Sequence, residues 1–300
     1  MPDLVVLTDP RYVNPSFPTP YDLDVLEDDR LVVDACRALG LMVDRRSWDD
    51  PHFDWSSTRT VIFRSTWDYF DRFDEFERWL EKAKTRTQFI NPQELVFWNL
   101  DKRYLLDLAA KGVDIVPTYR VTPKIKENLK EIADKHGWQE IVVKPTISAT
   151  AKDTYRLTYQ QLILPSIQQR FDALCEQKTM MVQPFLSRVL EEGELSVIVI
   201  GGQVTHGVRK VAKSGEYRVQ SDFGGSIRLE QPDQEAIAIA QQAVQLCSEE
   251  PLYARIDLIK NDEGKWNLGE MELIEPELWF RLQPHAADVL AFAIKNSLKK

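Results

Sequence analysis

The chain of 300 residues has few of the side chains that most often carry covalent or metal chemistry, with three cysteines and four histidines. Cys36, Cys175 and Cys247 lie far apart in helix-like patterns, which is typical of reduced core thiols and not of disulfides or a metal site. The histidines show no ligand spacing, and no serine or cysteine sits in a recognisable nucleophile motif. Covalent catalysis by a protein side chain therefore has no support in the sequence.

Long apolar runs and an excess of positive charge are also missing. No segment approaches the roughly 20 apolar residues needed to cross a bilayer, and the N-terminus lacks the pattern of a secretory signal. These absences predict a cytoplasmic protein with no membrane partner. The formal net charge of -9 argues against nucleic acid as a partner, because phosphate binding relies on clustered Lys and Arg. Small ligands, Mg-bound or uncharged, are favoured instead.

Strands alternate with helices in the first third of the chain. An apolar run from Leu4 to Asp9 precedes a helical pattern from about Asp24 to Leu39, and a strand from Thr60 to Phe63 precedes the helix DEFERWLEKAK. This alternation predicts a parallel sheet covered on both faces. Ligands of such sheets bind outside the carboxyl ends of the strands, so the loops after Leu7 and Phe63 are predicted on the ligand side.

The pattern changes further along the chain to longer strands and hairpins mixed with helices. We predict an α/β unit over residues 1–97, a smaller α+β unit over 98–185 and a C-terminal α+β unit over 186–300. The predicted fold class is therefore mixed α/β and α+β.

The stretch LGEMELIEPELWF alternates carboxylates with apolar side chains. Glu270 and Glu272 share one face of the predicted strand, which on its own indicates ordinary alternation toward solvent. Asp257 lies on the preceding strand, and the turn between the strands predicts a hairpin that brings it close to both glutamates. Three clustered carboxylates repel one another unless a cation intervenes, and oxygen ligands suit Mg²⁺ with nucleotide phosphates completing its shell. The acidic face therefore predicts a metal–nucleotide platform.

Two lysines are candidates for phosphate binding. Lys144 ends the apolar strand EIVVKP, where a buried ammonium is costly unless an anion meets it, and Ser148 in the following loop offers a further donor. A lysine whose stem reaches solvent explains the pattern equally well. Lys102 opens a predicted helix, whose first amides favour anions. Taken alone, Lys102 is more simply an exposed helix lysine.

Several motifs together resemble a known family. Lys102, VVKP, QPFL followed by GELS, and RID followed by GEMELIEP resemble, in order and spacing, the ATP-grasp carboxylate–amine ligases, such as glutathione synthetase and D-alanine–D-alanine ligase. The resemblance spans roughly Asn99 to Pro276. RSTWDY, RKVAKSGEYRVQSDFGGS and ELIEP are closer to the branch that contains the cycloserine-biosynthesis cyclase. The implied fold is an ATP-grasp fold, with a Rossmann-like pre-ATP-grasp domain and two α+β subdomains that sandwich ATP.

The resemblance also implies a role for each matching residue. The residues implied in ATP binding are Lys102, Lys144, Ser148, Gln183, Phe185, Leu186 and Glu194. The implied ligands of Mg²⁺, or of Mn²⁺ as an alternative ion, are Asp257, Glu270 and Glu272. The implied catalytic cations, which neutralise the transferred phosphoryl group and the acyl intermediate, are Lys144, Lys210 and Arg255. This sequence departs from many relatives in having Glu272 where they have asparagine, and in the absence of glycine from residues 146–152.

Recognition of the acceptor is predicted for the N-terminal loops. The candidates there are Arg64, Ser65, Thr66, Trp67, Asp68 and Tyr69, with Arg209 and Arg218 placed in the same neighbourhood by the resemblance. Arg64 would pair with a substrate carboxylate and Asp68 with an ammonium. Capping of a helix by Thr66 or Asp68 is the competing interpretation.

The hypothesis for the reaction is phosphorylation of a substrate carboxylate by Mg-ATP, followed by attack of an amine on the acyl phosphate. The resemblance implies a small-molecule substrate, an amino acid or a derivative of one. Whether the nitrogen belongs to a second molecule or to the same one stays open, as does a homodimer. Two rivals are a kinase that stops at phosphoryl transfer and a non-catalytic nucleotide-binding regulatory module.

Overall fold

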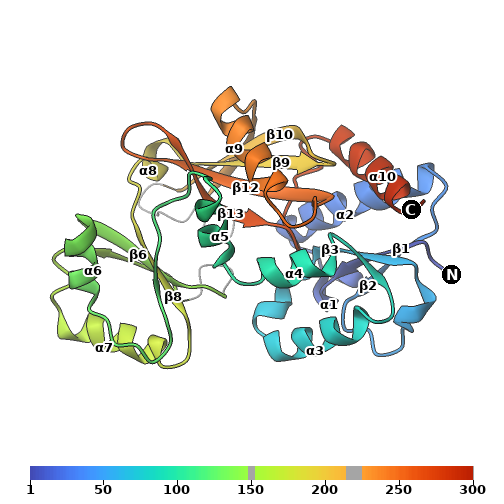
Figure 1. Cartoon of the computed structure of the whole chain (residues 1–300). Helices are drawn as coiled ribbons and strands as arrows, with labels where there is room; N and C mark the ends of the chain where they lie inside the picture. Colours follow the sequence, from blue (N-terminus) through green and yellow to red (C-terminus); the bar gives the residue numbers. More distant parts are fainter. Residues whose placement is uncertain (148–152, 214–224, 300) are drawn as a thin grey trace.

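The computed structural model describes residues 1–147, 153–213 and 225–299, and its strands form three sheets. Figure 1 shows an N-terminal sheet at one end, a central sheet built by the C-terminal part of the chain, and a small sheet at the other end. The N-terminal sheet is parallel, whereas the other two are antiparallel. The predicted mixture of α/β and α+β architecture is therefore confirmed.

The N-terminal sheet has the strand order β2-β1-β3-β4. Its strands are β1 (Leu4–Thr8), β2 (Val43–Ser47), β3 (Thr60–Ser65) and β4 (Gln88–Ile90). Its helices are α1 (Pro10–Val13), α2 (Pro20–Ala38) and α3 (Phe73–Ala83), with the short 3-10 helices η1 (Trp55–Ser57) and η2 (Trp67–Phe70). Thr19 and Asp22 form a capping box that fixes the start of α2.

Both faces of the N-terminal sheet are covered, as its apolar strands predict. Alternate residues of β1 enter different cores: Leu4 packs on the side of α2, whereas Val5 packs on the side of α3. The carboxyl ends of β1 and β3 are adjacent, and the amide of Asp9 donates to the carbonyl of Ser65 at 2.9 Å. The loops that follow these strands therefore emerge at the same edge.

The central sheet has the strand order β11-β10-β9-β12-β13. Its strands are β9 (Glu194–Ile200), β10 (Gln203–Val211), β11 (Ser226–Glu230), β12 (Tyr253–Lys260) and β13 (Trp266–Glu272), preceded by the short helix α8 (Val189–Glu192). One face packs against α4 (Gln93–Asn99), α5 (Tyr104–Ala110) and α9 (Gln234–Gln245). The other face packs against α10 (His285–Ser297), which also contacts α2. One core therefore joins the N-terminal and central sheets.

The small sheet has the strand order β5-β8-β6-β7. It consists of β5 (Tyr119–Val121), β6 (Glu140–Pro145), β7 (Tyr155–Thr158) and β8 (Met180–Pro184), with α6 (Leu129–His136) and α7 (Pro165–Cys175) packed on it. The predicted boundary at residue 98 differs from this arrangement, because α5 buries Tyr104, Leu105 and Leu108 against the central sheet. Helix α5 belongs to the central core and not to the small unit.

Asn91 connects the N-terminal sheet to the central one. This residue follows β4, is buried, and has a φ of 61°, in the left-handed region. Its Nδ2 donates to the carbonyls of Tyr253 at 2.9 Å and Leu273 at 2.6 Å, and its Oδ1 accepts from the amide of Leu252 at 2.6 Å. One side chain therefore satisfies backbone groups at the ends of both β12 and β13.

Replacing Asn91 with glycine is expected to lower the free energy of unfolding by about 2–4 kcal/mol, because buried backbone groups lose their partners. Glycine tolerates the positive φ, so the loss of stability reports the missing hydrogen bonds and not backbone strain. Thermal or urea unfolding measures it, with N14G at the exposed Asn14 as the matched control. A stability equal to that of the wild type would contradict this account of the junction.

Candidate active site

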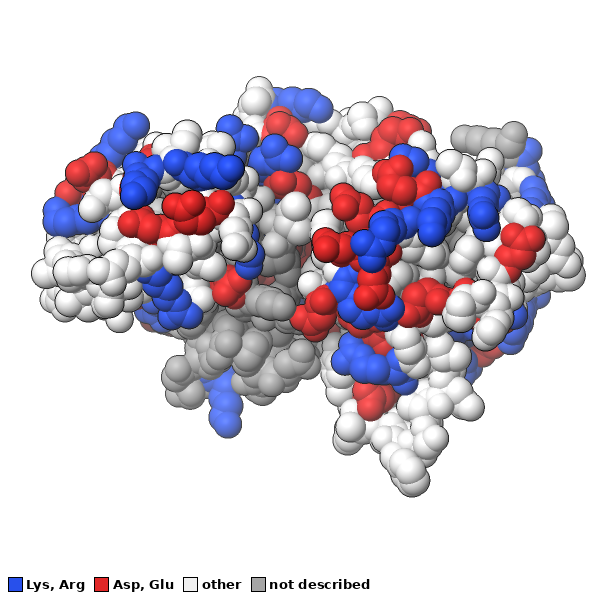
Figure 2. All heavy atoms as spheres, turned by 90° about the horizontal axis from the view of Figure 1, so that it is seen from below, with Lys and Arg blue, Asp and Glu red and all other residues white. Residues whose placement is uncertain are grey.

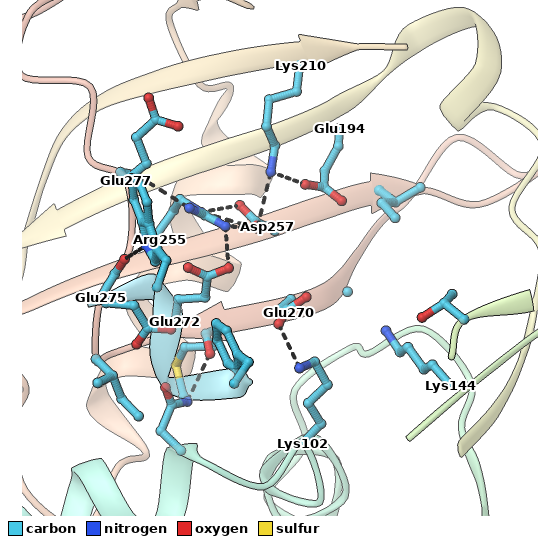
Figure 3. Close-up of a pocket in the computed structure, with 18 of the residues that line it drawn as sticks. Lys102, Lys144, Glu194, Lys210, Arg255, Asp257, Glu270, Glu272, Glu275 and Glu277 are labelled. Atoms are coloured by element: carbon cyan, nitrogen blue, oxygen red, sulfur yellow. Dashed lines mark hydrogen bonds and ion pairs between the residues drawn. The ribbon is translucent and has the colours of Figure 1, made fainter. Parts of the chain in front are cut away.

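A cavity of about 640 Å³ lies where the three sheets meet. The volume falls within the range of roughly 300–1,000 Å³ that small-molecule sites occupy. Its walls include loop residues that follow β1 and β3, strand residues of the small sheet, and charged residues of β9, β10, β12 and β13. Both loops predicted on the ligand side contribute to it, through Tyr12 and Trp67. Figure 3 shows its charged side chains pointing toward one another.

The hairpin of β12 and β13 supplies the acidic wall. Its register pairs Asp257 with Glu270 and Arg255 with Glu272, with an irregularity after Asp257. The four charged groups consequently lie on the cavity face of the sheet, as the alternation predicts. Asp257 is 2% exposed. The hairpin therefore brings these carboxylates to one face of the sheet, and their action as a metal cluster stays a prediction.

Each of these carboxylates has a cationic partner. Arg255 Nη2 lies 3.0 Å from Asp257 and also contacts Glu272. Lys210 Nζ lies 3.2 Å from Asp257 and also contacts Glu194 on the adjacent strand. The strand order β10-β9-β12 brings these three charges together. The cluster is thus a network of alternating charges (Figure 3).

The pKa values show how strongly these groups interact. Burial alone would raise the pKa of Asp257, but Arg255 and Lys210 outweigh it and lower the pKa to about 2. Burial raises the pKa of Glu272 to about 8, because repulsion by Glu270 and Asp257 offsets the attraction of Arg255. Burial is the largest cause of this shift, and the neighbouring carboxylates add to it.

The donor set fits Mg²⁺. Within the described ranges, no three His, Cys, Asp or Glu side chains are already arranged as a metal site. However, Asp257 and Glu270 are opposite one another on adjacent strands, and a divalent cation would offset the repulsion that adds to the effect of burial on the pKa of Glu272. Asp257, Glu270 and Glu272 are the residues that would hold it, and their role as ligands stays a prediction.

Lys102 and Lys144 reach the other end of the acidic wall (Figure 3). Lys102 Nζ lies 3.2 Å from Glu270. Burial lowers the pKa of Lys144, and Lys102 adds to this effect while Glu270 opposes it. The amide of Lys102 donates to the carbonyl of Thr146 at 2.8 Å, which ties the two lysine-bearing segments together. Two ammonium groups in one cavity favour an anion, so the prediction of phosphate binding gains a geometric basis.

The residues predicted to bind adenine and ribose also line the cavity: Gln183, Phe185, Leu186 and Glu194. Gln183 is 5% exposed, and its Nε2 donates to Thr118 Oγ1 at 2.8 Å. The amide of Phe185 donates to the carbonyl of Glu140 at 2.9 Å, so its backbone is fixed beside β6. Val142 of β6 and Met271 of β13 add apolar surface to the wall. The assignment of wall residues to adenine and ribose stays a prediction.

The loop after β3 requires a correction. Trp67 and Tyr69 line the cavity, whereas Arg64, Ser65, Thr66 and Asp68 do not. Arg64 is 3% exposed, and its Nη1 donates to the carbonyl of Pro276 at 3.0 Å. Asp68 accepts from Trp48 Nε1 at 2.8 Å. These side chains hold the loop in place and do not reach the ligand space in this conformation.

The other protein groups around this loop bury the side chains of Arg64, Ser65 and Thr66. These three residues therefore do not line the cavity. The guanidinium of Arg64 lies 5.3 Å from the centre of the Phe280 ring, and Ser65 Oγ donates to Asp29 at 3.0 Å. Thr66 is fully buried, and it begins η2 without a side-chain capping bond. The competing interpretation, capping by Thr66 or Asp68, is therefore not what the structure shows.

Arg209 is a second correction. It pairs with Glu230 and lies 5.1 Å from the ring of Trp266, which belongs to the core on the far side of the central sheet. Adjacent residues of a strand point to opposite faces, so Arg209 faces away when Lys210 faces the cavity. Arg209 is therefore not in the substrate neighbourhood. Ser148 and Arg218 lie outside the described residues, and their assignments stay predictions.

The sequence argument missed several wall residues. Arg11 and Tyr12 lie in α1, shortly after β1, Tyr21 lies in the first turn of α2, and Glu275 and Glu277 follow β13. Their position is the only signal in the sequence, because Arg11 and Tyr12 belong to the segment after Leu7 that is predicted on the ligand side. No single motif marked them.

Outside the cavity, the surface charges are mixed. Figure 2 shows the face seen from below in Figure 1, where blue Lys and Arg side chains lie beside red Asp and Glu side chains. On this view of the described residues, the negative charge of the chain is not gathered into one field.

Comparison with known proteins identifies the class. The family model described as prokaryotic glutathione synthetase, ATP-grasp domain, matches residues 107–274. A second model, described as D-cycloserine synthetase DcsG, N-terminal domain, matches residues 4–91. The chain belongs to the ATP-grasp ligases, enzymes that form carbon–nitrogen bonds with ATP and Mg²⁺.

Within that family, the chain is similar to the cycloserine biosynthesis protein DcsG of Streptomyces lavendulae, with 33% identity over 296 residues, 95% of this chain and 96% of that protein. The crystal structure of D-cycloserine synthetase DcsG superposes with a TM-score of 0.86 and 28% identity, covering 98% of this chain and 99% of that one. D-Alanine–D-alanine ligase from Bacillus anthracis shares the fold, with a TM-score of 0.66, 10% identity and coverage of 100% and 98%. Among the described residues, the structure contains no helix of membrane-spanning length and hydrophobicity.

Proposed function

We propose that the protein uses Mg-ATP to activate the carboxylate of a small amino-acid derivative, and that a nitrogen of the same molecule then attacks it to close a ring. The observation that carries this proposal concerns the N-terminal unit. Residues 4–91 match the N-terminal domain of D-cycloserine synthetase, and the same segment supplies the aromatic wall of the cavity through Tyr12, Tyr21, Trp67 and Tyr69. The part of the chain that would select the substrate is thus similar to that of a cyclising relative.

The charged residues suit the activation step. Lys102 and Lys144 would hold the phosphates of ATP, and Asp257, Glu270 and Glu272 would hold Mg²⁺, which supplies charge neutralisation when bound. Arg255 and Lys210 face the same space and would stabilise the negative charge that develops as the carboxylate takes the phosphoryl group. Positioning and charge neutralisation supply the rate, so no protein nucleophile is needed.

The size of the cavity supports a small substrate. A volume of 640 Å³ must admit the nucleotide as well as the acceptor. The wall beyond Arg255 combines aromatic rings with carboxylates, and this combination suits a compact polar molecule that carries both an amine and a carboxylate. An amino-acid derivative meets that description.

Free phosphate released from Mg-ATP tests the proposal across a panel of amino acids and derivatives, offered singly and in pairs, with product masses recorded. Release with a single compound, together with a product lighter than that compound by one water, would support cyclisation. Release that requires two compounds would replace cyclisation by intermolecular ligation. A stable phosphorylated product would indicate the kinase, and silence despite demonstrated ATP binding would indicate the regulatory module.

Lys144→Ala is the control for the panel. It removes an ammonium that faces the predicted phosphate position, so phosphate release is expected to fall to background while the overall fold is retained. Release by this variant at the rate of the wild type would assign the activity to a contaminant or would remove Lys144 from the phosphate site.

A further inference from the structure

Glu275 is a buried carboxylate in the cavity wall whose bonding partner differs from those of its acidic neighbours. It is 8% exposed, and its Oε1 accepts a hydrogen bond from Tyr69 Oη at 2.9 Å. The carboxylates that the central sheet and the segment after β13 add to the cavity are otherwise paired with cations: Glu194 with Lys210, Asp257 with Arg255, Glu270 with Lys102, Glu272 with Arg255, and Glu277 with Arg281. Among the described residues, no Lys, Arg or His nitrogen lies within 4.0 Å of Glu275.

A buried carboxylate without a counter-ion is unfavourable unless a bound group supplies positive charge or a hydrogen-bond donor. The Tyr69 hydroxyl supplies one donor, and the backbone amide of Glu275 itself supplies another. Neither donor carries a positive charge. Since Glu275 lines the cavity, a nitrogen of the bound substrate is the natural further donor.

The place of Glu275 in the cavity fits this role. Figure 3 shows it beside Arg255 and Glu272, on the side away from Lys144. The predicted phosphates lie near Lys144, so the activated carboxylate would lie near Arg255, between the phosphates and Glu275. Trp67 and Tyr69 form the wall next to it, because Trp67 Nε1 donates to the carbonyl of Glu275 at 3.0 Å. A nucleophile bound at this wall would approach the acyl carbon from the side of Glu275.

The geometry points to Glu275 as the group that accepts the proton of the attacking nitrogen. This inference rests on the proposed function. The nitrogen lone pair forms the new C–N bond, the bond from the acyl carbon to the phosphate oxygen breaks, and inorganic phosphate leaves with that electron pair. The proton that the nitrogen loses moves to the carboxylate of Glu275 and from there to solvent. Tyr69 is the positioning residue that holds the carboxylate in place.

The electrostatic surroundings suit a proton acceptor. Burial raises the pKa of Glu275 to about 7, against the opposing effect of the Tyr69 hydrogen bond. The titratable or charged groups that face Glu275 are Tyr69, Lys102, Tyr253, Arg255 and Glu272. A base with a pKa near the working pH combines a useful ionised fraction with a strong tendency to take the proton.

Glu275→Gln separates the two halves of the reaction. The substitution keeps the size of the side chain and an acceptor for Tyr69, but it removes the base. Formation of the C–N product is expected to fall by about 10²-fold or more, the usual contribution of a general base. Activation of the carboxylate is expected to continue, measured as the hydroxamate that forms when hydroxylamine traps the acyl phosphate. E263Q, at an exposed glutamate in the turn after β12, is the matched control.

Tyr69→Phe gives an independent test if Glu275→Gln does not fold. Removing the hydroxyl raises the pKa of Glu275 further, because that hydrogen bond lowers it. Product formation needs the ionised carboxylate, so the acidic limb of its pH profile is expected to move to higher pH, while the profile of hydroxamate formation stays in place.

Several outcomes would overturn the inference. Product formation by E275Q at the wild-type rate would remove Glu275 from proton transfer, and parallel loss of product and hydroxamate would place it in the activation step. An unshifted acidic limb in Y69F would equally count against it. Failure of the wild type to form any hydroxamate with the panel would overturn the proposed function itself. This outcome is distinguishable from failure of the Glu275 inference, because it is observed in the wild type before any variant is tested.

Discussion

Replacing Glu270 with glutamine is expected to lower ATP turnover by about 10²–10³-fold, the usual cost of losing one preorganised electrostatic group. Glu270 is opposite Asp257 in the hairpin and lies 3.2 Å from Lys102. The amide would remove a negative ligand from the proposed metal site and a counter-charge from Lys102. The loss should shrink as Mg²⁺ is raised, because the remaining carboxylates still attract the ion. Phosphate release measured against Mg²⁺ concentration gives both the loss of turnover and its dependence on Mg²⁺.

The matched control for this change is again E263Q, which alters an exposed glutamate outside the cavity. Thermal unfolding of E270Q in the absence of nucleotide should show a folded protein. Turnover equal to that of the wild type at limiting Mg²⁺ would contradict the assignment of Glu270 to the metal. A large loss of turnover that no concentration of Mg²⁺ reduces would indicate that Glu270 acts as the counter-charge of Lys102 and not as a metal ligand.

The acidic cluster was predictable because it depends on local geometry. A strand alternates its side chains with a period of two, and a short turn returns the chain beside itself, so Asp257 had to face Glu270 or a near neighbour. The same rule, applied to β10, separates Arg209 from Lys210. The prediction that Arg209 and Lys210 both lie near the substrate is therefore inconsistent with the alternation of side chains in a strand, which the sequence alone indicates.

Contacts between distant strands were not predictable in this way. The network of Lys210, Glu194 and Asp257 depends on β9 lying between β10 and β12, and no local pattern specifies that order. The burial of Arg64 depends on the carbonyl of Pro276, which is 212 positions away in the chain. Such long-range partners decide whether a charged loop residue reaches a ligand or supports the loop.

The unit boundaries show the same limit. The helix after residue 98 has an apolar face that two neighbouring sheets could each have buried, and the sequence does not say which. The structure places α5 on the central sheet, so the small unit begins as a sheet at Tyr119. Lys102 is consequently carried by the central core, while Lys144 is carried by the small sheet. The two proposed phosphate ligands therefore come from different units and meet across the cavity.

Replacing Arg255 with methionine is expected to abolish turnover and to lower the free energy of unfolding at pH 8 by about 3–5 kcal/mol, the usual cost of breaking a buried ion pair. Arg255 binds both Asp257 and Glu272, and after its replacement by methionine Lys210 still lies 3.2 Å from Asp257, whereas Glu272 loses the cation that it contacts. The destabilisation should depend on pH. Burial already raises the pKa of Glu272 to about 8, and Arg255 lowers it, so its removal raises that pKa further.

The native state of the Arg255→Met variant would then bind a proton that the unfolded chain, with a glutamate pKa near ~4.3, releases. The wild type binds the same proton only below its own pKa of about 8, so the variant should recover part of its loss relative to the wild type as the pH falls from about 10 to about 8. Urea unfolding at the two pH values, alongside Arg255→Lys, measures this recovery. Arg255→Lys keeps the charge and should lose less stability at pH 8. A destabilisation of Arg255→Met that is the same at both pH values would show that Arg255 acts by packing and not as the counter-ion of the cluster.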